Sequence, residues 1–383
     1  MKFILLLFIL QACLPVPAAE RAFYLWQRSW TPETELAVRA CDRPLSAFAA
    51  ELFRDKTERS AAPAEFWRRP GVTAVFRLRL DAISTEGFRR LAAEIVRNGC
   101  PRVQLDADIP ERRLAEYADR LKELRQALPA SVREFSITAL PCHLPYAAFA
   151  DAARQADYYV LQLHGLDVPR NIEEPYALLD PAVARTAIVR ARKLGRPFRL
   201  ALPTYAYRLS FDPGTGAFAA ISAEGGAPPE GRWNNRLAAP DPALLRDLLR
   251  ENPDLPVIWF RLPVRGDLLN YDRETIAQLE TGVIPVERLD IELRRTAPNA
   301  VELRVTPRAR IQLEPLRLEL SWPRRTGEFD LAPGVRNESG NRAFAVLPDR
   351  LSVPFGGCGT QVRAATFFID AVSVKKKITP SIP

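Results

Sequence analysis

The stretch Val103-Gln104-Leu105-Asp106-Ala107-Asp108 determines how the rest of the chain is interpreted. Apolar and polar side chains alternate along it without a break, which is typical of a half-buried β-strand. Pro110 follows two residues later and suits the first turn of a helix, because its missing N–H would have no partner there. We therefore predict a strand over 103–108 and a helix over 110–128, with two carboxylates where the strand ends.

Similar strand patterns recur along the chain, and helical patterns separate most of them. The predicted strands cover 23–30, 47–53, 73–80, 103–108, 134–140, 158–163, 198–202 and 256–262. The predicted helices cover 85–98, 110–128, 146–156, 180–194 and 272–280, and another begins at Thr31. Strands that alternate with helices in this way predict an α/β fold, a parallel (β/α)8 TIM-type barrel over 20–283. In such barrels the catalytic groups lie at the carboxyl ends of the strands.

Two segments depart from this alternation. Residues 207–240 form an insertion between the last two predicted strands, with a hairpin turn over 212–216. A long loop on this side of a barrel is more often a lid or a substrate wall than an unrelated feature. From residue 284 a period of two replaces the helical pattern, so we expect a small antiparallel β-sandwich over 284–374 and a disordered tail over 375–383.

Residues 1–19 are predicted to be a signal peptide. Lys2 precedes a short apolar run over 3–10, and small residues over 16–19 offer a cleavage site. A second interpretation places a lipid on Cys13, because Leu10-Gln11-Ala12-Cys13 is similar to a bacterial lipobox. Both interpretations predict an exported protein, periplasmic or extracellular, whose only membrane attachment is that lipid.

The composition is that of a soluble globular protein, with 47% hydrophobic and 26% charged residues. The formal net charge is +8, but the arginines are dispersed among Asp and Glu, which favours a mixed solvated surface over nucleic-acid binding. No C-x-x-C spacing or Cys/His cluster indicates a metal site, and we expect no cofactor. Outside the signal peptide the cysteines are Cys41, Cys100, Cys142 and Cys358, of which Cys41 and Cys100 are candidates for a disulfide.

Strand parity predicts which side chains face the barrel interior. Helices cover the outside of a barrel, so the more apolar face of each strand should point outward. On this basis Arg77 faces inward, whereas Phe48 is assigned to the outer face. The inward and rim side chains that we consider as substrate-binding candidates are Trp26, Arg28, Trp30, Glu51, Arg79, Gln104, Gln162, His164, Tyr205, Trp259 and Arg261.

Asp106 and Asp108 are the candidate catalytic residues. Alternate residues on a strand lie roughly 6.5–7 Å apart at Cβ, from a rise of about 3.3 Å per residue. Two carboxylates at this spacing disfavour ionisation of both, so the pKa of one should rise and supply a general acid near neutral pH. We assign Asp108 as the acid and Asp106 as the base, nucleophile or supporting group.

The pattern Gln104-x-Asp106-x-Asp108 resembles the D-x-D-x-E motif on the fourth strand of chitinase-like barrels. The resemblance implies that Asp108 stands where that motif has its acid, a glutamate, and that Asp106 stands at the supporting aspartate. Gln104 replaces the first aspartate, and the acid is one methylene group shorter than in the motif.

Four stretches together resemble a secreted bacterial family known as domain of unknown function 3142. They are Tyr24-Leu25-Trp26-Gln27-Arg28-Ser29-Trp30, Val103-Gln104-Leu105-Asp106-Ala107-Asp108, Ser136-Ile137-Thr138-Ala139-Leu140-Pro141 and Tyr159-Val160-Leu161-Gln162-Leu163-His164-Gly165. The resemblance implies a barrel distantly similar to glycoside hydrolases and brings no activity with it. Where Trp is expected after Leu140-Pro141, this chain has Cys142-His143.

Three interpretations of function remain open. Carboxylates, amides and aromatic rings that converge inside a barrel suit a sugar ring, so the first is an exported glycoside hydrolase that acts on a polysaccharide or oligosaccharide. The second is a non-catalytic glycan-binding or envelope-assembly protein on the same barrel. The third is a structural network of ion pairs in the barrel floor, with the function on the surface of the β-domain.

Overall fold

The computed structural model describes residues 19–222, 233–265, 267 and 269–284 with their side chains. From residue 285 onward it describes only the backbone of the strands β13 to β20. The signal-peptide prediction with Cys13, and also Cys358, falls outside the described residues, apart from Ala19.

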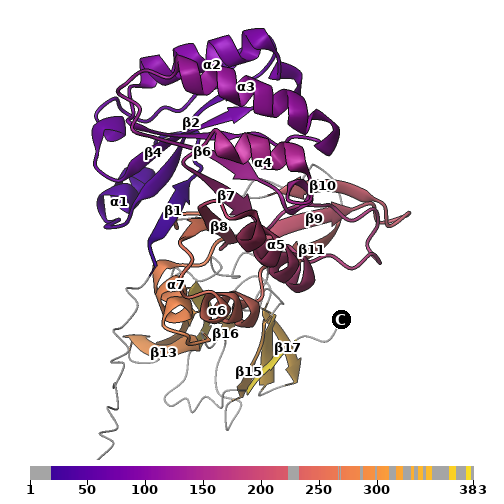
Figure 1. Ribbon diagram of the computed structural model, residues 1–383. Helices are drawn as coiled ribbons and strands as arrows, with labels where there is room; N and C mark the ends of the chain where they lie inside the picture. The colour runs from indigo at the N-terminus through magenta and orange to yellow at the C-terminus, as the bar shows by residue number, and fades with distance from the viewer. Residues whose placement is uncertain are drawn as a thin grey trace, which may run out of the picture.

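Eight parallel strands in the described part of the chain close into a barrel (Figure 1). In order around the barrel they are β1 (Arg21–Leu25), β2 (Leu45–Leu52), β4 (Val72–Leu78), β5 (Arg102–Asp106), β6 (Glu134–Ala139), β7 (Tyr158–Gln162), β8 (Phe198–Pro203) and β12 (Val257–Phe260). β1 pairs in parallel with both β2 and β12, which closes the sheet. A short strand β3 (Thr57–Arg59) adds to β2 in the antiparallel sense. The predicted (β/α)8 barrel is confirmed.

The helices follow the strands and lie on the outside of the barrel (Figure 1). The Thr31 hydroxyl accepts a hydrogen bond from the Thr34 backbone N–H and so caps the first helix, while Gly99 in the left-handed conformation ends the second. The helices are α1 (Pro32–Arg39), α2 (Thr85–Asn98), α3 (Leu114–Ala127), α4 (Ala147–Arg154), α5 (Pro181–Leu194), α6 (Pro242–Glu251) and α7 (Arg273–Glu280).

Two hydrophobic clusters pack on opposite faces of the barrel sheet. The larger one lies between strands and helices and includes Leu105 of β5 and Leu121 of α3, both fully buried. Burial of one such leucine contributes roughly 1.5–3 kcal/mol to stability. The smaller cluster fills the barrel interior with Ala22, Tyr24, Val75, Tyr158, Val160, Ala201 and Ile258. Apolar side chains therefore fill the lower barrel, and polar ones are concentrated toward its carboxyl end.

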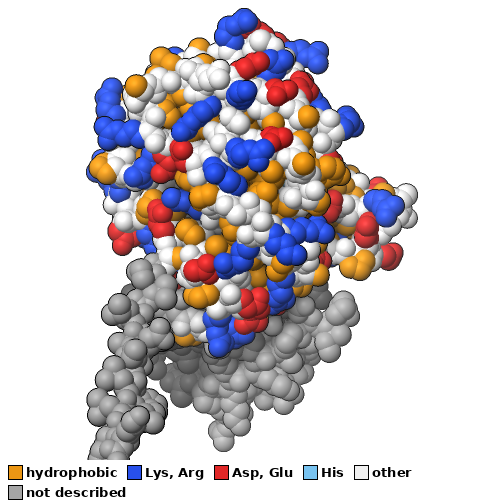
Figure 2. All heavy atoms as spheres, viewed as in Figure 1, with side chains coloured by type: hydrophobic (Ala, Val, Ile, Leu, Met, Phe, Trp, Pro, Cys, Tyr) orange, Lys and Arg blue, Asp and Glu red, His pale blue; other side chains and the backbone are white. Residues whose placement is uncertain are grey.

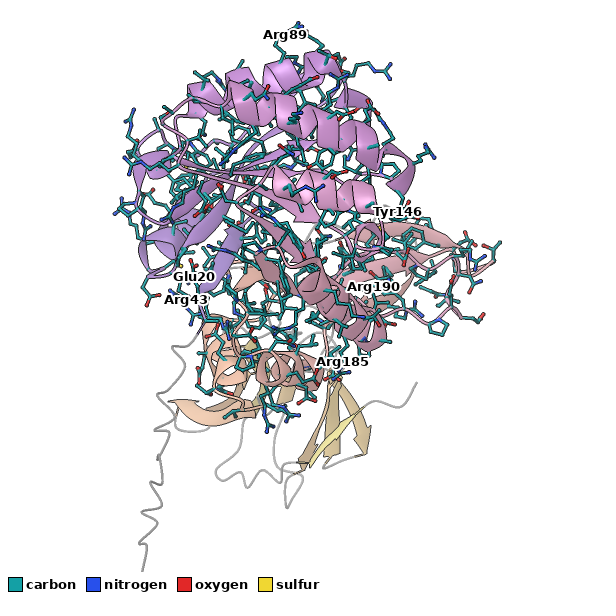
Figure 3. The ribbon with its side chains drawn as sticks, viewed as in Figure 1. Glu20, Arg43, Arg89, Tyr146, Arg185 and Arg190 are labelled. Carbon is teal, nitrogen blue, oxygen red and sulfur yellow. The ribbon has the colours of Figure 1, made fainter. Side chains whose placement is uncertain are left out.

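The predicted orientation of β12 is wrong. Trp259 belongs to the outer core, where its indole Nε1 donates a 2.7 Å hydrogen bond to Glu280 Oε1 at the end of α7. The same carboxylate pairs with Arg43, which is labelled in Figure 3. Ile258 and Phe260 instead face the interior. Both faces of this strand are apolar, so the alternation of side chains does not indicate which face points into the barrel.

The predicted orientation of Phe48 is also wrong. Its ring lies 5.6 Å from that of Trp26 at the barrel interior, although Glu51, three residues later, also faces inward. The pairing of β2 with β4 shifts register between Phe48 and Ala50. Such a bulge inserts one extra residue and interrupts the alternation of side chains, which allows both residues to face the same way.

The insertion forms a small three-stranded antiparallel sheet that projects beside the barrel (Figure 1). Asp212 Oδ1 accepts hydrogen bonds from the backbone N–H groups of Gly214 and Thr215, and these fix the predicted hairpin turn. The strands are β9 (Tyr207–Phe211), β10 (Phe218–Ser222) and β11 (Asn234–Ala238), in the order β10-β9-β11.

Two four-stranded antiparallel sheets follow the barrel, as expected for a small β region. One has the order β13 (Arg288–Ala297), β14 (Ala300–Ala309), β19 (Val362–Phe367) and β16 (Phe329–Leu331). The other has the order β17 (Val335–Ser339), β18 (Arg342–Val346), β15 (Leu316–Ser321) and β20 (Lys377–Pro380). β20 corrects part of the predicted disordered tail, because its backbone pairs with β15 and its sequence contains the strand-forming residues Ile378 and Thr379.

The candidate disulfide between Cys41 and Cys100 is not formed. Both are buried free thiols, and their Sγ atoms donate to separate backbone carbonyls, those of Arg43 and Val72. Cys142 is a free thiol at the surface. In the described part of the chain no helix combines the length and the apolar character that crossing a membrane requires.

Basic side chains are dispersed over the visible surface, as the sequence predicts (Figure 2). Many of them form ion pairs with acidic residues of neighbouring elements. Arg185 on α5, labelled in Figure 3, pairs with Glu251 of α6 at 2.7 Å, and Arg192 pairs with Asp254 at 2.8 Å. The charge of this face is therefore locally balanced between the helices.

Candidate functional site

A cavity of about 370 Å³ lies at the carboxyl ends of the barrel strands. Strands β1, β4, β5, β6, β7, β8 and β12, or the residues just after them, all contribute to its wall, and so does the start of the insertion. The lining residues are Tyr24, Trp26, Arg28, Arg77, Asp106, Asp108, Thr138, Val160, Gln162, His164, Gly165, Ala201, Tyr205, Tyr207, Phe260 and Arg261.

Most of the candidate residues predicted from the sequence meet in this cavity. They come from five different strands and the segments that follow them, so only the closed barrel brings them together. The predicted residues that line it are Trp26, Arg28, Asp106, Asp108, Gln162, His164, Tyr205 and Arg261.

The other five candidates lie outside the cavity. Trp30 packs against Phe66, with ring centroids 5.0 Å apart. Gln104 is buried below the cavity floor, Glu51 lies behind the lining arginines, and Arg79 is half exposed beside it. Trp259 belongs to the outer core.

Several lining residues were not among the candidates. Parity placed Arg77 inside the barrel, but sequence spacing does not reveal which carboxylates it contacts. Phe260 was missed because of the wrong orientation of β12, and Tyr207 because it belongs to the insertion rather than to a barrel strand. A rule that treats the first residues of an insertion as extensions of the preceding strand would have found Tyr207.

Arg77 links the acidic groups of the site. Its Nη1 lies 3.2 Å from Asp106 Oδ2, its Nη2 lies 2.7 Å from Asp108 Oδ2, and its Nε lies 3.6 Å from Glu51 Oε1. Glu51 is buried and also pairs with Arg28. Buried carboxylates are costly unless a cation compensates them, so one guanidinium holds this group of charges together.

The two candidate catalytic carboxylates have different surroundings. Burial raises the pKa of Asp106 to about 6, although Arg77 and a hydrogen bond from Thr138 oppose this, and the neighbouring Asp108 adds to the rise. The side chain of Asp108 is 45% exposed, whereas that of Asp106 is 7% exposed. The expected rise in pKa therefore falls on Asp106, because Asp106 is the desolvated member of the pair.

A layer of hydrogen bonds supports Asp106 from below. Gln104 Nε2 donates to the Tyr24 hydroxyl at 2.6 Å and to Thr138 Oγ1 at 3.0 Å, and all these groups are buried. Thr138 in turn hydrogen-bonds the Asp106 carboxylate. The amide at position 104 thus acts beneath the cavity rather than in its wall.

On the opposite side of the cavity, none of the described lining residues is a carboxylate. His164 Nδ1 lies 3.2 Å from the Tyr205 hydroxyl, and the Tyr205 ring contacts the Tyr207 ring at 4.9 Å between centroids. Phe260 packs against both His164 and Tyr205. The other histidine, His143, is buried outside the cavity and bonded to backbone at both ring nitrogens.

The described residues contain no group of three or more His, Cys, Asp or Glu side chains arranged to hold a metal ion. The residues that line the cavity offer carboxylates, guanidinium groups, an amide, an imidazole, hydroxyls and aromatic faces. Two neighbouring carboxyl groups, one with a raised pKa, can perform acid–base chemistry, and aromatic faces can stack on the apolar side of a ring-shaped ligand.

Solved structures share the architecture of this chain. The Bacillus cereus spore cortex-lytic enzyme SleL superimposes with a TM-score of 0.50 at 12% identity, over 70% of this chain and 74% of that one. A chitinase from Chromobacterium violaceum gives a TM-score of 0.48 at 12% identity, over 69% of this chain and 99% of that one. At such identities the similarity concerns the fold alone, and it places this protein among the parallel (β/α)8 barrels.

A family model matches part of the barrel sequence. Residues 78–265 match the model described as Domain of unknown function (DUF3142), the family that the sequence stretches resemble, and three of those four stretches lie within the match. The match runs from the last residue of β4 to just beyond β12 and contains Asp106, Asp108 and His164. No curated protein matches the chain.

Proposed function

We propose that this protein is a glycoside hydrolase that cleaves a polysaccharide or oligosaccharide with the help of Asp106 and Asp108. The observation that carries the proposal is the pair itself. A buried carboxyl group with a pKa of about 6 lies beside a second, half-exposed carboxylate, in a cavity at the carboxyl ends of barrel strands. Hydrolysis of a glycosidic bond commonly uses two carboxyl groups of this kind.

The remaining lining residues support a sugar as the ligand. Trp26 and Phe260 are partly buried and present aromatic surface to the cavity, to which the C–H face of a pyranose could bind. Arg28, Gln162 and Thr138 supply hydrogen-bonding groups for hydroxyls. A concave site with apolar faces and a few polar groups is typical of small-molecule and carbohydrate recognition.

We give Asp106 the role of general acid, in place of the assignment to Asp108 drawn from the motif. With a pKa of about 6, Asp106 carries a proton in mildly acidic solution, and it donates this proton to the glycosidic oxygen as the bond breaks. Asp108 then acts as the base that accepts a proton from the attacking water, whose oxygen bonds to the anomeric carbon. Protons and electron pairs balance in this step without a cofactor.

We also propose that the protein is exported, on the basis of the apolar run and cleavage site in residues 1–19. Export would bring the cavity to glycans of the cell envelope or the surroundings. Attachment through a lipid on Cys13 remains the alternative to simple cleavage.

A second candidate function is non-catalytic glycan binding. The observation that favours it is that Arg77 contacts both carboxylates at once, at 3.2 and 2.7 Å. A binding protein tolerates such permanent pairing, whereas a hydrolase must release at least one carboxylate when substrate enters. Under this alternative, glycans bind and no bond is cleaved.

The test is release of reducing ends from a panel of bacterial and plant polysaccharides. We expect release by the wild-type protein and its loss in both Asp106→Asn and Asp108→Asn. Asp119→Asn, at an exposed position on α3, is the matched control and should retain full activity. Glycan binding without release, by a protein that is folded, would contradict hydrolysis and support the second candidate.

A further inference from the structure

The cavity has two chemically different sides. Arg28, Arg77, Asp106 and Asp108 form a charged side at the ends of β1, β4 and β5 and in the residues just after them. Across from them lies a set of residues without formal charge, which we call the neutral wall. Its members are Gln162, His164, Tyr205, Tyr207 and Phe260.

The neutral wall is a connected cluster rather than a chance grouping. Gln162 Nε2 donates a 3.1 Å hydrogen bond to the backbone carbonyl of His164, and His164 Nδ1 lies 3.2 Å from the Tyr205 hydroxyl. The His164 ring also packs on Phe260, with centroids 5.3 Å apart. These contacts hold the imidazole in one orientation.

His164 has hydrogen-bonding capacity that the fold does not use. Its side chain is buried, with 3% of the residue exposed, and its Nε2 atom has no hydrogen-bond partner among the described residues. Burial alone lowers the pKa of His164 to about 3, with no charged group contributing to the shift. Buried polar atoms are rarely left without a partner, so a ligand group is the natural partner for Nε2.

Gly165 leaves the space in which the two tyrosine hydroxyls meet. A Cβ atom at this position would lie 3.0 Å from the Tyr205 hydroxyl and 3.2 Å from the Tyr207 hydroxyl. Its φ of +64° is also one that glycine adopts without strain. The absence of a side chain at Gly165 therefore leaves room for both hydroxyls, and the Tyr205 hydroxyl also contacts His164.

The nearest cation on this side is already compensated. Arg261 is almost fully buried, and its guanidinium forms an ion pair with Asp267 through contacts of 2.5 and 3.2 Å. The neutral wall thus contributes dipoles and an aromatic surface, but no net charge, to the ligand.

We propose that the neutral wall binds an uncharged hydrogen-bonding group of the substrate, with His164 Nε2 as its central contact, so that this site takes glycans that carry no charge at that position. The inference rests on the proposed glycan-processing function and specifies its substrate class. An ionised group buried against this wall would lose its hydration without gaining a counter-ion, and such desolvation is strongly unfavourable. Sugars with a free amine or a carboxylate there should be rejected.

The first test uses the two histidines of the chain, His143 and His164, as NMR probes in the full-length protein. We expect the His164 imidazole to remain neutral between about pH 8 and pH 5, because its burial lowers its pKa to about 3. His164→Gln identifies which signals belong to His164. Titration of His164 within this range would overturn the proposal, because the wall would then acquire a charge.

The second test compares oligosaccharides of equal length. The neutral probes are oligomers of N-acetylglucosamine and of glucose, and the charged probes are oligomers of glucosamine and of galacturonate. We expect a neutral probe to shift the His164 signals and leave those of His143 unchanged. We expect the charged counterparts to bind at least about tenfold more weakly, the equivalent of roughly 1.4 kcal/mol.

Two variants test whether the neutral wall contributes to the affinity for the neutral probes. Tyr205→Phe removes one hydroxyl, and His164→Leu removes both ring nitrogens while keeping an apolar side chain of similar burial. Each should weaken the neutral probe about tenfold or more. Charged probes that bind as well as neutral ones would overturn the inference and leave the proposed function intact. If none of the probes binds, the proposed function falls and the inference falls with it.

Discussion

Replacement of Arg77 by methionine is expected to lower the free energy of unfolding by about 3–5 kcal/mol at about pH 7.5. Methionine retains an unbranched apolar stem but removes the guanidinium that contacts Asp106, Asp108 and Glu51. Loss of one partner leaves buried carboxylates uncompensated, which costs far more than loss of an exposed ion pair. Urea unfolding, with the slope checked against wild type, measures the change.

The pH dependence of this loss has a definite sign. Arg77 lowers the pKa of Asp106, so the variant should have an even higher Asp106 pKa than the wild type. A carboxyl group whose folded-state pKa lies above its unfolded value destabilises the protein as pH rises and it ionises. The loss should therefore be smaller at about pH 5 than at about pH 7.5.

Arg79→Met provides the matched control for Arg77→Met. Arg79 is about half exposed and lies 3.8 Å from Glu51, so its removal should cost less than about 1 kcal/mol. Equal effects of the two substitutions, or no dependence on pH, would show that the Arg77 contacts do not carry the stability that we assign to them.

The barrel could be predicted from the sequence because its signals are local. Each strand such as 103–108 pairs an apolar outer face with a more polar inner face near its carboxyl end, and helices with clear start and stop residues follow. Asp106, Arg77 and Gln162 were placed inside correctly for this reason. A two-residue period is sufficient to predict which side chains face inward wherever the two faces of a strand differ in polarity.

The same reasoning fails where the two faces of a strand have the same polarity or where the alternation of side chains is interrupted. β12 is apolar on both faces, so only Glu280, far along the chain, shows that Trp259 faces outward. The register shift in β2 brings Phe48 inward, and alternation does not reveal where such a shift occurs. Tertiary contacts, not the pattern within the strand, determine these orientations.

The electrostatics of the site could be predicted only in part. Spacing predicted that one of two carboxyl groups would have a raised pKa, and this expectation is met, but spacing does not determine which one is desolvated. Asp106 is the last residue of β5 and lies below the rim, whereas Asp108 has left the strand. The depth of Asp106 in the barrel therefore explains why its pKa is raised.

Asp106→Asn is expected to raise stability while it removes activity. The pKa of Asp106 is raised from 3.8 to about 6 in the folded protein, mainly by burial. Above that pH its ionised form costs on the order of 2–4 kcal/mol of folding free energy, from about 1.4 kcal/mol per pKa unit. Asparagine has the same shape and does not ionise, and its oxygen can still accept hydrogen bonds from Arg77 and Thr138.

The gain should follow the ionisation of the wild-type residue. At about pH 7.5 we expect Asp106→Asn to unfold at a higher urea concentration than wild type, with a gain on the order of 2–4 kcal/mol, because the pKa of about 6 already includes the opposing Arg77 attraction. The gain should shrink as the pH falls through about 6 and approach zero below the unfolded pKa of 3.8, where Asp106 is protonated in both states. At every pH the rate of glycan hydrolysis should be lower by roughly 10²–10⁴-fold.

This result separates the interpretations that the sequence left open. If the ion pair with Arg77 instead outweighs the cost of burial, ionised Asp106 stabilises the barrel floor, and Asp106→Asn should destabilise the protein. A carboxyl group retained at a cost to stability is expected at a functional site instead. Arg77 keeps Asp108 at 2.7 Å in the variant, so it still has a carboxylate partner, and the change in stability reports on Asp106 itself. Destabilisation at about pH 7.5 would therefore favour the structural network over a catalytic pair.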